Sequence, residues 1–439
     1  FADVMLKDEG MAELLPACNT IVLDEAHQLP ETATEFFGET VSTGQILDLC
    51  RDALAEALAS AADVRELPDL VRRADKGARD LRLAVPRKEM RLPAAALDDD
   101  REFVNAVAGL RTALGALARG LAALAERSEG LDNCARRAAE VVERLERWSQ
   151  APGGEVVRWV EAFTQSLALR MTPLSIAAPF RRQLDGAPRA WIFTSATLAV
   201  RGDFSHYQHE LGLEDADSAS WESPFDYAAN ALLYMPQALP LPNSPEHTDA
   251  VVDAAVPVLA ASRGRAFLLF TSLRAMRQAH ARLAERLRAS GLDLPLLLQG
   301  EGSRSELLER FRRLGNAVLV ASASFWEGVD VRGEALSVVV IDKLPFAPPD
   351  DPVLAARLEH LRRNGRNPFL EYQVPQAAIA LKQGTGRLIR DEHDRGVLVL
   401  CDPRVLSKPY GRQLLDSLPP MPRTRVISDV VAFFAGAPR

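Results

Sequence analysis

Short apolar runs alternate with amphipathic stretches over the C-terminal half of the chain. Apolar runs of about four to eight residues between turn residues are typical of buried strands, and apolar positions three and four residues apart are typical of helices. The predicted strands are 266–271, 294–299, 317–321, 336–341 and 397–401, and the predicted helices are 272–290 and 303–314, which stop at Gly291 and Gly315. This alternation predicts an α/β fold with an open parallel sheet covered by helices on both faces.

The first half of the chain carries two different patterns. Residues 17–24 form an apolar run that ends in acid and predict a buried strand, and strand character returns at 190–194. Between them Ala, Leu, Arg and Glu dominate, and apolar residues recur at helical spacing. Pro and Gly interrupt this stretch at several points. We therefore predict an all-helical insertion within a first α/β domain.

The changes of pattern predict the domain boundaries. Residues 1–42 and 186–235 belong to the first α/β domain, 43–185 to the helical insertion, and 236–439 to a second α/β domain. The Pro-rich stretch 199–247 is predicted to be mostly loop. A chain of 439 residues is long enough for two or three domains.

The composition is that of a soluble globular protein. Of all residues 47% are hydrophobic and 26% are charged, and no apolar run is long enough to span a bilayer. The formal net charge of −8 means that nucleic-acid binding would need a local basic groove. Cys18, Cys50, Cys134 and Cys401 include no pair at metal-ligand spacing, so we predict buried free thiols in a reducing cytoplasm.

Two carboxylates after the first strand suit a metal-dependent hydrolysis. Asp24 and Glu25 follow the apolar run 21–23, and His27 stands two residues further on. Phosphoryl transfer to water needs a divalent ion on the phosphates and a positioned water. Asp24 suits Mg²⁺ bound through a water, and Glu25 suits the attacking water. The alternative is a helix N-terminus that is merely enriched in acid.

A basic motif near the C-terminus suits the other half of such a reaction. Gln383, Arg387 and Arg390 stand at i, i+4 and i+7, so one helical face would present an amide and two guanidiniums. Gly384 and Gly386 lie in the same stretch, where each costs about 1 kcal/mol of helix stability relative to Ala. The functional interpretation is an arginine finger. The alternative is a solvated basic helix end.

Hydroxyl groups follow two of the predicted strands. Thr194, Ser195 and Thr197 stand where the chain turns, and could link a hydrolytic site to motion or cap a helix. Thr271 and Ser272 end the first strand of the second domain, and could hold a phosphate or cap the next helix.

The stretch 324–330 (SFWEGVD) interrupts the second sheet with two aromatic residues, two acids and a glycine. Trp326 or Phe325 could stack a nucleic-acid base, or a buried aromatic could anchor the loop. The following strand ends in 341–346 (IDKLPF), with a charged pair and a Pro turn.

Taken in order, these motifs resemble motifs II to VI of superfamily 2 helicases. They are DEAH at 24–27, TSAT at 194–197, LFTS at 269–272, SFWEGVD at 324–330 and QGTGRLIR at 383–390. SFWEGVD with IDKLPF soon after it is similar to the XPD/DinG group, and the whole run resembles its bacterial DinG/YoaA branch.

The resemblance implies two RecA-like P-loop motor domains, the first incomplete, with the insertion as the counterpart of an arch domain. It also implies ATP- and Mg²⁺-dependent 5′ to 3′ translocation on single-stranded DNA. The expected substrates are forked or overhang duplexes in DNA repair or replication. The expected enzyme is a monomeric, cytoplasmic motor that does not engage membranes.

The resemblance also implies residue roles. Asp24 and Glu25 would serve Mg²⁺ and water, His27 would couple the site to the opposite domain, and Gln383, Arg387 and Arg390 would approach the γ-phosphate from the second motor domain. The positions expected to bind nucleotide are Glu327, Gly328, Asp330 and Gly386. The positions expected to couple the site to DNA, or to contact DNA, are Thr194, Ser195, Thr197, Thr271, Ser272 and Trp326.

Two features of the family are expected upstream of motif II. These are the glycine-rich phosphate loop and four cysteines that hold a 4Fe-4S cluster, and the 23 residues before Asp24 contain neither. We therefore expect that the chain as given binds ATP poorly and does not unwind DNA, and that the helicase function belongs to the whole protein. The alternatives are an ATPase-inactive nucleic-acid-binding remnant and a nuclease, for which further acidic ligands are lacking.

Overall fold

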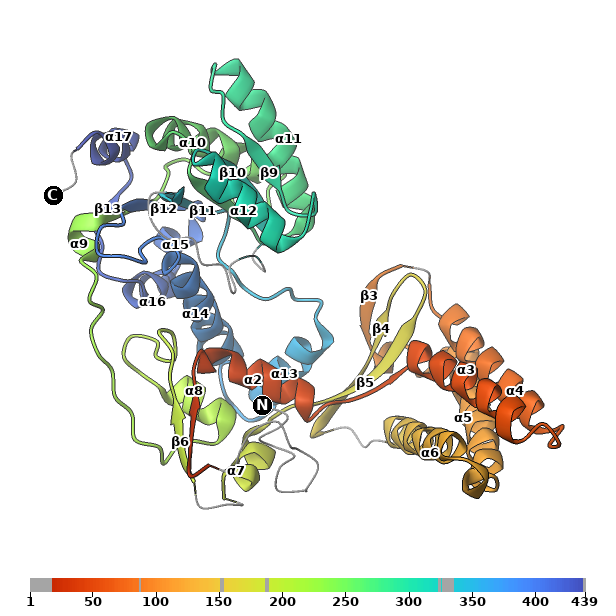
Figure 1. Cartoon of the computed structure of the whole chain (residues 1–439). Helices are drawn as coiled ribbons and strands as arrows, with labels where there is room; N and C mark the ends of the chain where they lie inside the picture. Colours follow the sequence, from red (N-terminus) through yellow and green to blue (C-terminus); the bar gives the residue numbers. More distant parts are fainter. Residues whose placement is uncertain are drawn as a thin grey trace. The chain divides into compact units, whose positions relative to one another are not determined.

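The computed structural model describes residues 18–86, 88–150, 154–185, 189–322, 325 and 335–436 (Figure 1). The chain forms two compact units. Unit 1 contains the described residues up to Ser195, Gln208–Glu214 and Pro348–Arg366. Unit 2 contains Ala196–Tyr207, Asp215–Ala347 and the described residues from Asn367 onward.

Unit 2 is built on a seven-stranded sheet in the order β13-β7-β12-β11-β8-β10-β9, in which all neighbouring strands are parallel. Its strands are β7 Ala231–Tyr234, β8 Ala266–Phe270, β9 Leu296–Leu298, β10 Val318–Ser322, β11 Val338–Ile341, β12 Gly396–Leu400 and β13 Arg423–Thr424. Five of them overlap the apolar runs that predict strands, and the α/β prediction is confirmed.

Helices cover both faces of this sheet. Along β11, Val339 and Ile341 pack in a core with α12, α14 and α16, while Val338 and Val340 pack in a second core with α10, α11 and α17. Strands buried on both faces consist of nearly continuous apolar residues, as here. The helices of unit 2 are α9 Tyr227–Asn230, α10 His247–Ser262, α11 Leu273–Ala289, α12 Arg304–Leu314, α14 Val374–Thr385, α15 Arg404–Ser407, α16 Pro409–Ser417 and α17 Ile427–Ala435.

Residues 199–247 are mostly loop, as predicted, but they include short elements that were not predicted. This stretch contains α8 Ser205–Leu211, the helix α9 and the strand β7. All four residues of β7 are buried, because Ala231 and Leu233 pack in the core on one face of the sheet and Leu232 and Tyr234 in the core on the other. Strands this short are easily hidden among turn residues in a sequence.

In unit 1, β1 Thr20–Leu23 pairs in parallel with β6 Ala190–Phe193, with Leu23 opposite Phe193. Both strands lie where the first domain was predicted to have them, but the prediction of a buried strand is wrong for most of β1, in which Ile21 is buried and Val22 is exposed. Because their carboxyl ends lie at the same edge, residues 24–27 and 194–195 leave the sheet side by side. Helices α2 Leu29–Phe36 and α7 Ala177–Asp185 belong to the same unit.

The insertion is not all helical, so that prediction is wrong. Its helices are α3 Thr43–Ser60, α4 Leu67–Leu83, α5 Arg101–Ala122 and α6 Glu129–Gln150, and they pack around one core. Its strands are β2 Glu39–Ser42, β3 Met90–Pro93, β4 Val156–Ala162 and β5 Leu167–Pro173, which form an antiparallel sheet in the order β2-β5-β4-β3 (Figure 1). In β5, Leu167, Leu169 and Met171 recur at every second position, which is the strand period.

One face of the insertion sheet carries a cluster of charged and aromatic side chains. The guanidiniums of Arg91 and Arg170 lie 5.4 and 5.3 Å from the ring centre of Trp159. Glu161 pairs with both arginines, at 3.0 and 2.8 Å. Arg91 also pairs with Asp351, which caps α13 Pro352–Arg363. The ion pair between Arg91 and Asp351 thus joins this cluster to the start of α13.

In the described part of the chain, every helix is too short or too polar to cross a membrane.

Candidate functional site

Asp24 lies directly after β1 and accepts a hydrogen bond from a hydroxyl of the TSAT motif. Thr194 Oγ1 donates to Asp24 Oδ1 at 2.8 Å. This bond, with a further one from the main-chain N–H of Glu25, lowers the pKa of Asp24 below its usual value. The carboxylate therefore stays ionised and exposed, as a ligand of a hydrated cation must be.

Glu25 has an uncommon backbone conformation. Its φ of 49° and ψ of 37° lie in the left-handed region, which non-glycine residues rarely adopt. The next N–H, of Ala26, donates to Thr194 O at 2.9 Å and ties this turn to the end of β6. Such backbone strain is concentrated at functional sites. The composition of the motif does not reveal it.

His27 and Ser195 both contact the Glu25 carboxylate. Ser195 Oγ donates to Glu25 Oε2 at 3.4 Å, and His27 Nδ1 lies 2.9 Å from Ser195 Oγ and 3.3 Å from Glu25 Oε2. The structure thus brings Asp24, Glu25 and His27 together with two TSAT hydroxyls. Neither hydroxyl precedes a helix, so the helix-cap alternative does not apply to Thr194 or Ser195. Thr197 is buried and belongs to unit 2.

This group fits a magnesium ion carried by a nucleotide. Mg²⁺ commonly takes one or two protein carboxylates and completes its shell with waters and substrate phosphates. Asp24 offers one ionised carboxylate. Across the residues that the structure describes, no group of three or more His, Cys, Asp or Glu side chains is arranged to hold a metal. The site is therefore suited to Mg²⁺ with phosphates.

The second group lies at the end of α14, and the predicted helical face is wrong. The helix ends at Thr385, and the N–H of Gly386 donates to Lys382 O at 2.9 Å. Gln383 is therefore in the last helical turn, while Arg387 and Arg390 lie beyond it. The physical reason lies in Gly384 and Gly386 at the end of the helix, because glycine costs about 1 kcal/mol of helix stability relative to Ala.

The end of β8 carries the third group. Ser272 caps α11, since its Oγ accepts from the N–H of Ala275 at 3.2 Å, and this confirms the cap alternative for Ser272. The N–H of Thr271 donates to Asp342 Oδ1 at 3.1 Å. Thr271 Oγ1 is buried and has no hydrogen-bond partner among the described residues.

Asp342 is a buried acid at the end of β11. It is 2% exposed, and burial raises its pKa to about 7, although N–H bonds from Thr271 and Lys343 oppose the rise. The sequence signal is an acid directly after an uninterrupted apolar strand.

We expect Asp342→Asn to remove a pH dependence of stability. Between its ordinary pKa of 3.8 and about 7, Asp342 is ionised in the unfolded chain and protonated in the folded one. Its neutral form is present in both states below about pH 4, and stability is lost as the pH rises to about 7. At about 1.4 kcal/mol per pH unit this loss is about 4 kcal/mol.

Urea unfolding followed by circular dichroism at pH 4 to 8 checks this expectation. Over that range, the free energy of unfolding of the Asn variant should increase by about 4 kcal/mol relative to that of the original chain. Asp217→Asn, at an exposed position of unit 2, is the control and should leave the profile unchanged. Parallel profiles for Asp342→Asn and the original chain would contradict the assignment.

Four of the predicted site residues, Trp326, Glu327, Gly328 and Asp330, lie outside the described residues. Phe325 is described and is 4% exposed. Arg304 Nη2 donates to Phe325 O at 3.2 Å, and the Arg304 guanidinium lies 5.2 Å from its ring centre. Phe325 is therefore a buried anchor, as the alternative interpretation proposed, and not a base-stacking side chain.

The cysteines match their prediction in three cases. Cys50, Cys134 and Cys401 are buried free thiols, but Cys18 is exposed, so the prediction is wrong for Cys18. Burial raises the pKa of Cys50 to about 12, which keeps it protonated and unreactive. Cys18 precedes β1 and stands beside Asn19 and Thr20, which are exposed as well.

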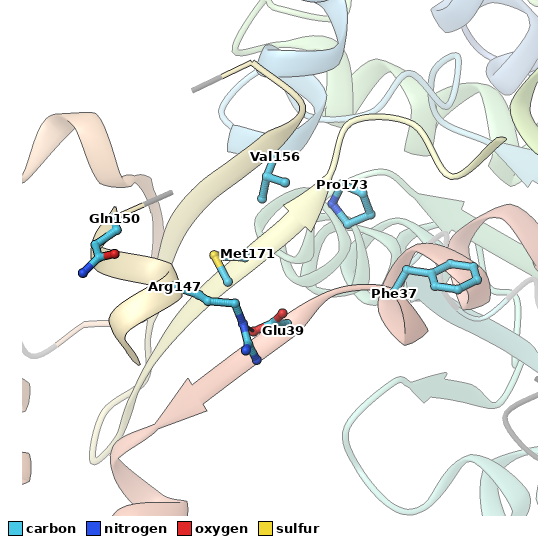
Figure 2. Close-up of a pocket in the computed structure, with 7 residues that line it drawn as sticks. All are labelled: Phe37, Glu39, Arg147, Gln150, Val156, Met171 and Pro173. Atoms are coloured by element: carbon cyan, nitrogen blue, oxygen red, sulfur yellow. Dashed lines mark hydrogen bonds and ion pairs between the residues drawn. The ribbon is translucent and has the colours of Figure 1, made fainter. Parts of the chain in front are cut away.

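A pocket of about 420 Å³ lies in the insertion, apart from all the predicted site residues. Figure 2 shows Arg147 beside Glu39, and the two side chains form an ion pair of 3.0 Å. The lining is otherwise largely apolar and comprises Phe37, Gln150, Val156, Met171 and Pro173. It contains no residue predicted to bind nucleotide.

Comparisons with known proteins identify helicase relatives. Residues 255–421 match the helicase C-terminal domain family. The chain is 43% identical to the ATP-dependent DNA helicase YoaA of Escherichia coli K12, over 99% of this chain and 68% of that protein. It is 40% identical to YoaA of Haemophilus influenzae, over 99% of this chain and 67% of that protein. Against the ATP-dependent helicase DinG of Mycobacterium tuberculosis H37Rv the identity is 38%, over 60% of this chain and 40% of that protein.

Solved XPD structures share the fold. A structure of S. tokodaii Xpd4 aligns over 97% of this chain and 81% of that chain, with a TM-score of 0.60 and 14% identity. An XPD helicase structure aligns over 92% of this chain and 68% of that chain, with a TM-score of 0.56 and 16% identity. The fold is thus that of the XPD RecA-like domains, and the chain belongs to the DinG/YoaA branch of the XPD-like superfamily 2 helicases.

Proposed function

We propose that this chain carries the hydrolytic and coupling residues of an ATP-dependent DNA helicase. The observation that carries the proposal is the cluster at the ends of β1 and β6. Thr194 donates a hydrogen bond to Asp24, and both Ser195 and His27 contact Glu25. Such contacts link the residues that would serve Mg²⁺ and water to a second strand of the sheet.

The residues divide the work as follows. Asp24 would hold Mg²⁺, and Glu25 orients the attacking water and accepts its proton. Bound Mg²⁺ neutralises charge on the phosphates. Arg387 and Arg390 stabilise the negative charge that develops on the γ-phosphoryl group, and Gln383 contributes an amide. Ser195 and His27 couple the position of Glu25 to the rest of the motor.

The substrate and the direction of movement are more specific properties than membership of the family. We propose translocation along single-stranded DNA from 5′ to 3′, with unwinding of forked or overhang duplexes in repair or replication, by a monomeric motor. The relatives that suggest DNA as the substrate are the YoaA helicases. In this proposal, nucleotide binding, the phosphate loop and any 4Fe-4S cluster belong to the full-length protein.

Strand-displacement assays on the full-length protein test the proposal. We expect ATP-dependent unwinding of a duplex with a 5′ single-stranded overhang, no unwinding of the 3′-overhang isomer, and ATPase stimulation by single-stranded DNA. Unwinding of the 3′ isomer alone would reverse the polarity. Binding of single-stranded DNA without ATP turnover would instead favour the ATPase-inactive remnant.

A further inference from the structure

The loop between Arg390 and β12 closes on the side chain of Asp394. Asp394 Oδ2 accepts the main-chain N–H groups of Arg390 at 2.8 Å and Asp391 at 2.9 Å. The N–H of Asp394 donates back to Asp391 O at 3.2 Å. Asp394 is 7% exposed, so little water competes for its carboxylate.

The other side of this segment is fixed by packing. Leu388 and Ile389 are buried in the core that covers one face of the sheet. Gly396 lies directly beneath Leu388, since a Cβ on Gly396 would stand 2.3 Å from Leu388 Cδ1. Arg390 is therefore held between two buried apolar residues and one buried carboxylate.

This arrangement replaces the helix that the spacing of the motif suggests. Outside a helix, the direction of an arginine side chain depends on how firmly its own main chain is held. Hydrogen bonds from N–H groups to an ionised carboxylate are about twice as strong as neutral ones. Two of them meet on one oxygen of Asp394, one from Arg390, which carries the guanidinium, and one from the next residue, Asp391.

We infer that Asp394 is a positioning residue for Arg390, holding its main chain in the conformation from which the guanidinium acts on the γ-phosphoryl group. The inference rests on the proposed function of Arg390. A misplacement of about 1 Å can cost about a hundredfold in rate, so loss of both N–H acceptors should reduce catalysis without removing the guanidinium.

The test is steady-state ATPase of the full-length protein with saturating single-stranded DNA. Asp394→Ala should lower kcat by about tenfold to a hundredfold, with KM for ATP changed by less than about twofold. Asp394→Asn keeps a side-chain oxygen that can accept both N–H groups, and it should restore most of the rate. Equal losses for Ala and Asn would overturn the inference.

Asp100→Ala is the matched control. Asp100 Oδ1 also accepts two main-chain N–H groups, from Glu102 at 2.9 Å and Phe103 at 3.3 Å, but it caps α5 in the insertion. It should leave kcat unchanged. A loss of kcat as large as that of Asp394→Ala would assign the effect to general loss of structure and overturn the inference.

A double-mutant cycle separates this inference from the proposed function. If Asp394 acts through Arg390, Asp394→Ala in an Arg390→Ala background should change kcat by less than about twofold. A full additional loss in that background would overturn the inference. An Arg390→Ala variant with undiminished ATPase would instead overturn the role of Arg390 itself.

A second variant guards against failure to fold. Asp394→Glu keeps the charge and moves the carboxylate by one methylene. If Asp394→Ala does not fold, a folded Glu variant should show the same tenfold or greater loss of kcat, and full activity of that variant would overturn the inference.

Discussion

Glu25→Gln is expected to lower DNA-stimulated ATP hydrolysis by the full-length protein by about 10² to 10⁴. The substitution keeps the size of the side chain and a side-chain oxygen for the contact with Ser195. It removes the charge that orients a water and accepts its proton. Nucleotide binding should therefore be retained while turnover is lost, as measured by single-turnover hydrolysis beside equilibrium binding of a fluorescent ATP analogue.

Glu35→Gln is the matched control for this prediction, because it makes the same chemical change at an exposed position of α2. It should hydrolyse ATP at the original rate. Unchanged turnover in Glu25→Gln would show that another group positions the water. Loss of nucleotide binding in that variant would show that Glu25 stabilises the bound ground state and not the transition state of hydrolysis.

The second α/β unit was largely predictable, because its strands are apolar runs with clear ends. The run at 317–321 became β10, and the helix predicted at 303–314 became α12, which begins at a Ser303 capping box and ends at Gly315. A strand buried on both faces needs no alternation, so its length and boundaries carry the signal.

The insertion sheet was not predictable in the same way. Its helices supply most of the Ala and Leu content, and the short β2 and β3 contain few residues with strong strand propensity. They are strands because β4 and β5 pair with them. Partners that are distant in sequence decide the structure of such segments, and a local pattern does not record them.

The candidate site was likewise predictable only in part. The residue types of DEAH and TSAT were visible in the sequence, but the contact between Thr194 and Asp24 depends on the pairing of β1 with β6, which are about 170 residues apart. The left-handed Glu25 is a property of the turn that follows this pairing. The end of α14 falls between Gly384 and Gly386, whose low helix propensity outweighs the helical spacing of the arginines.

Arg387→Ala and Arg390→Ala are each expected to lower the ATPase rate of the full-length protein by about 10³ to 10⁵. A guanidinium that stabilises transition-state charge contributes little to ground-state binding, so KM for ATP should change far less than kcat. Lys in place of either Arg should restore only a small part of the rate, since an ammonium lacks the planar set of donors.

The double variant distinguishes a shared role from two separate ones. If both arginines act on the same developing charge, the paired substitution should cost little more than the worse single one, because groups that act as a unit are not additive. Arg412→Ala, at a side chain that is 90% exposed on α16, is the control and should be neutral. If the rate losses of the two single variants multiply in the double variant, the two arginines serve different steps. A single variant with full activity would show that its residue does not act as an arginine finger.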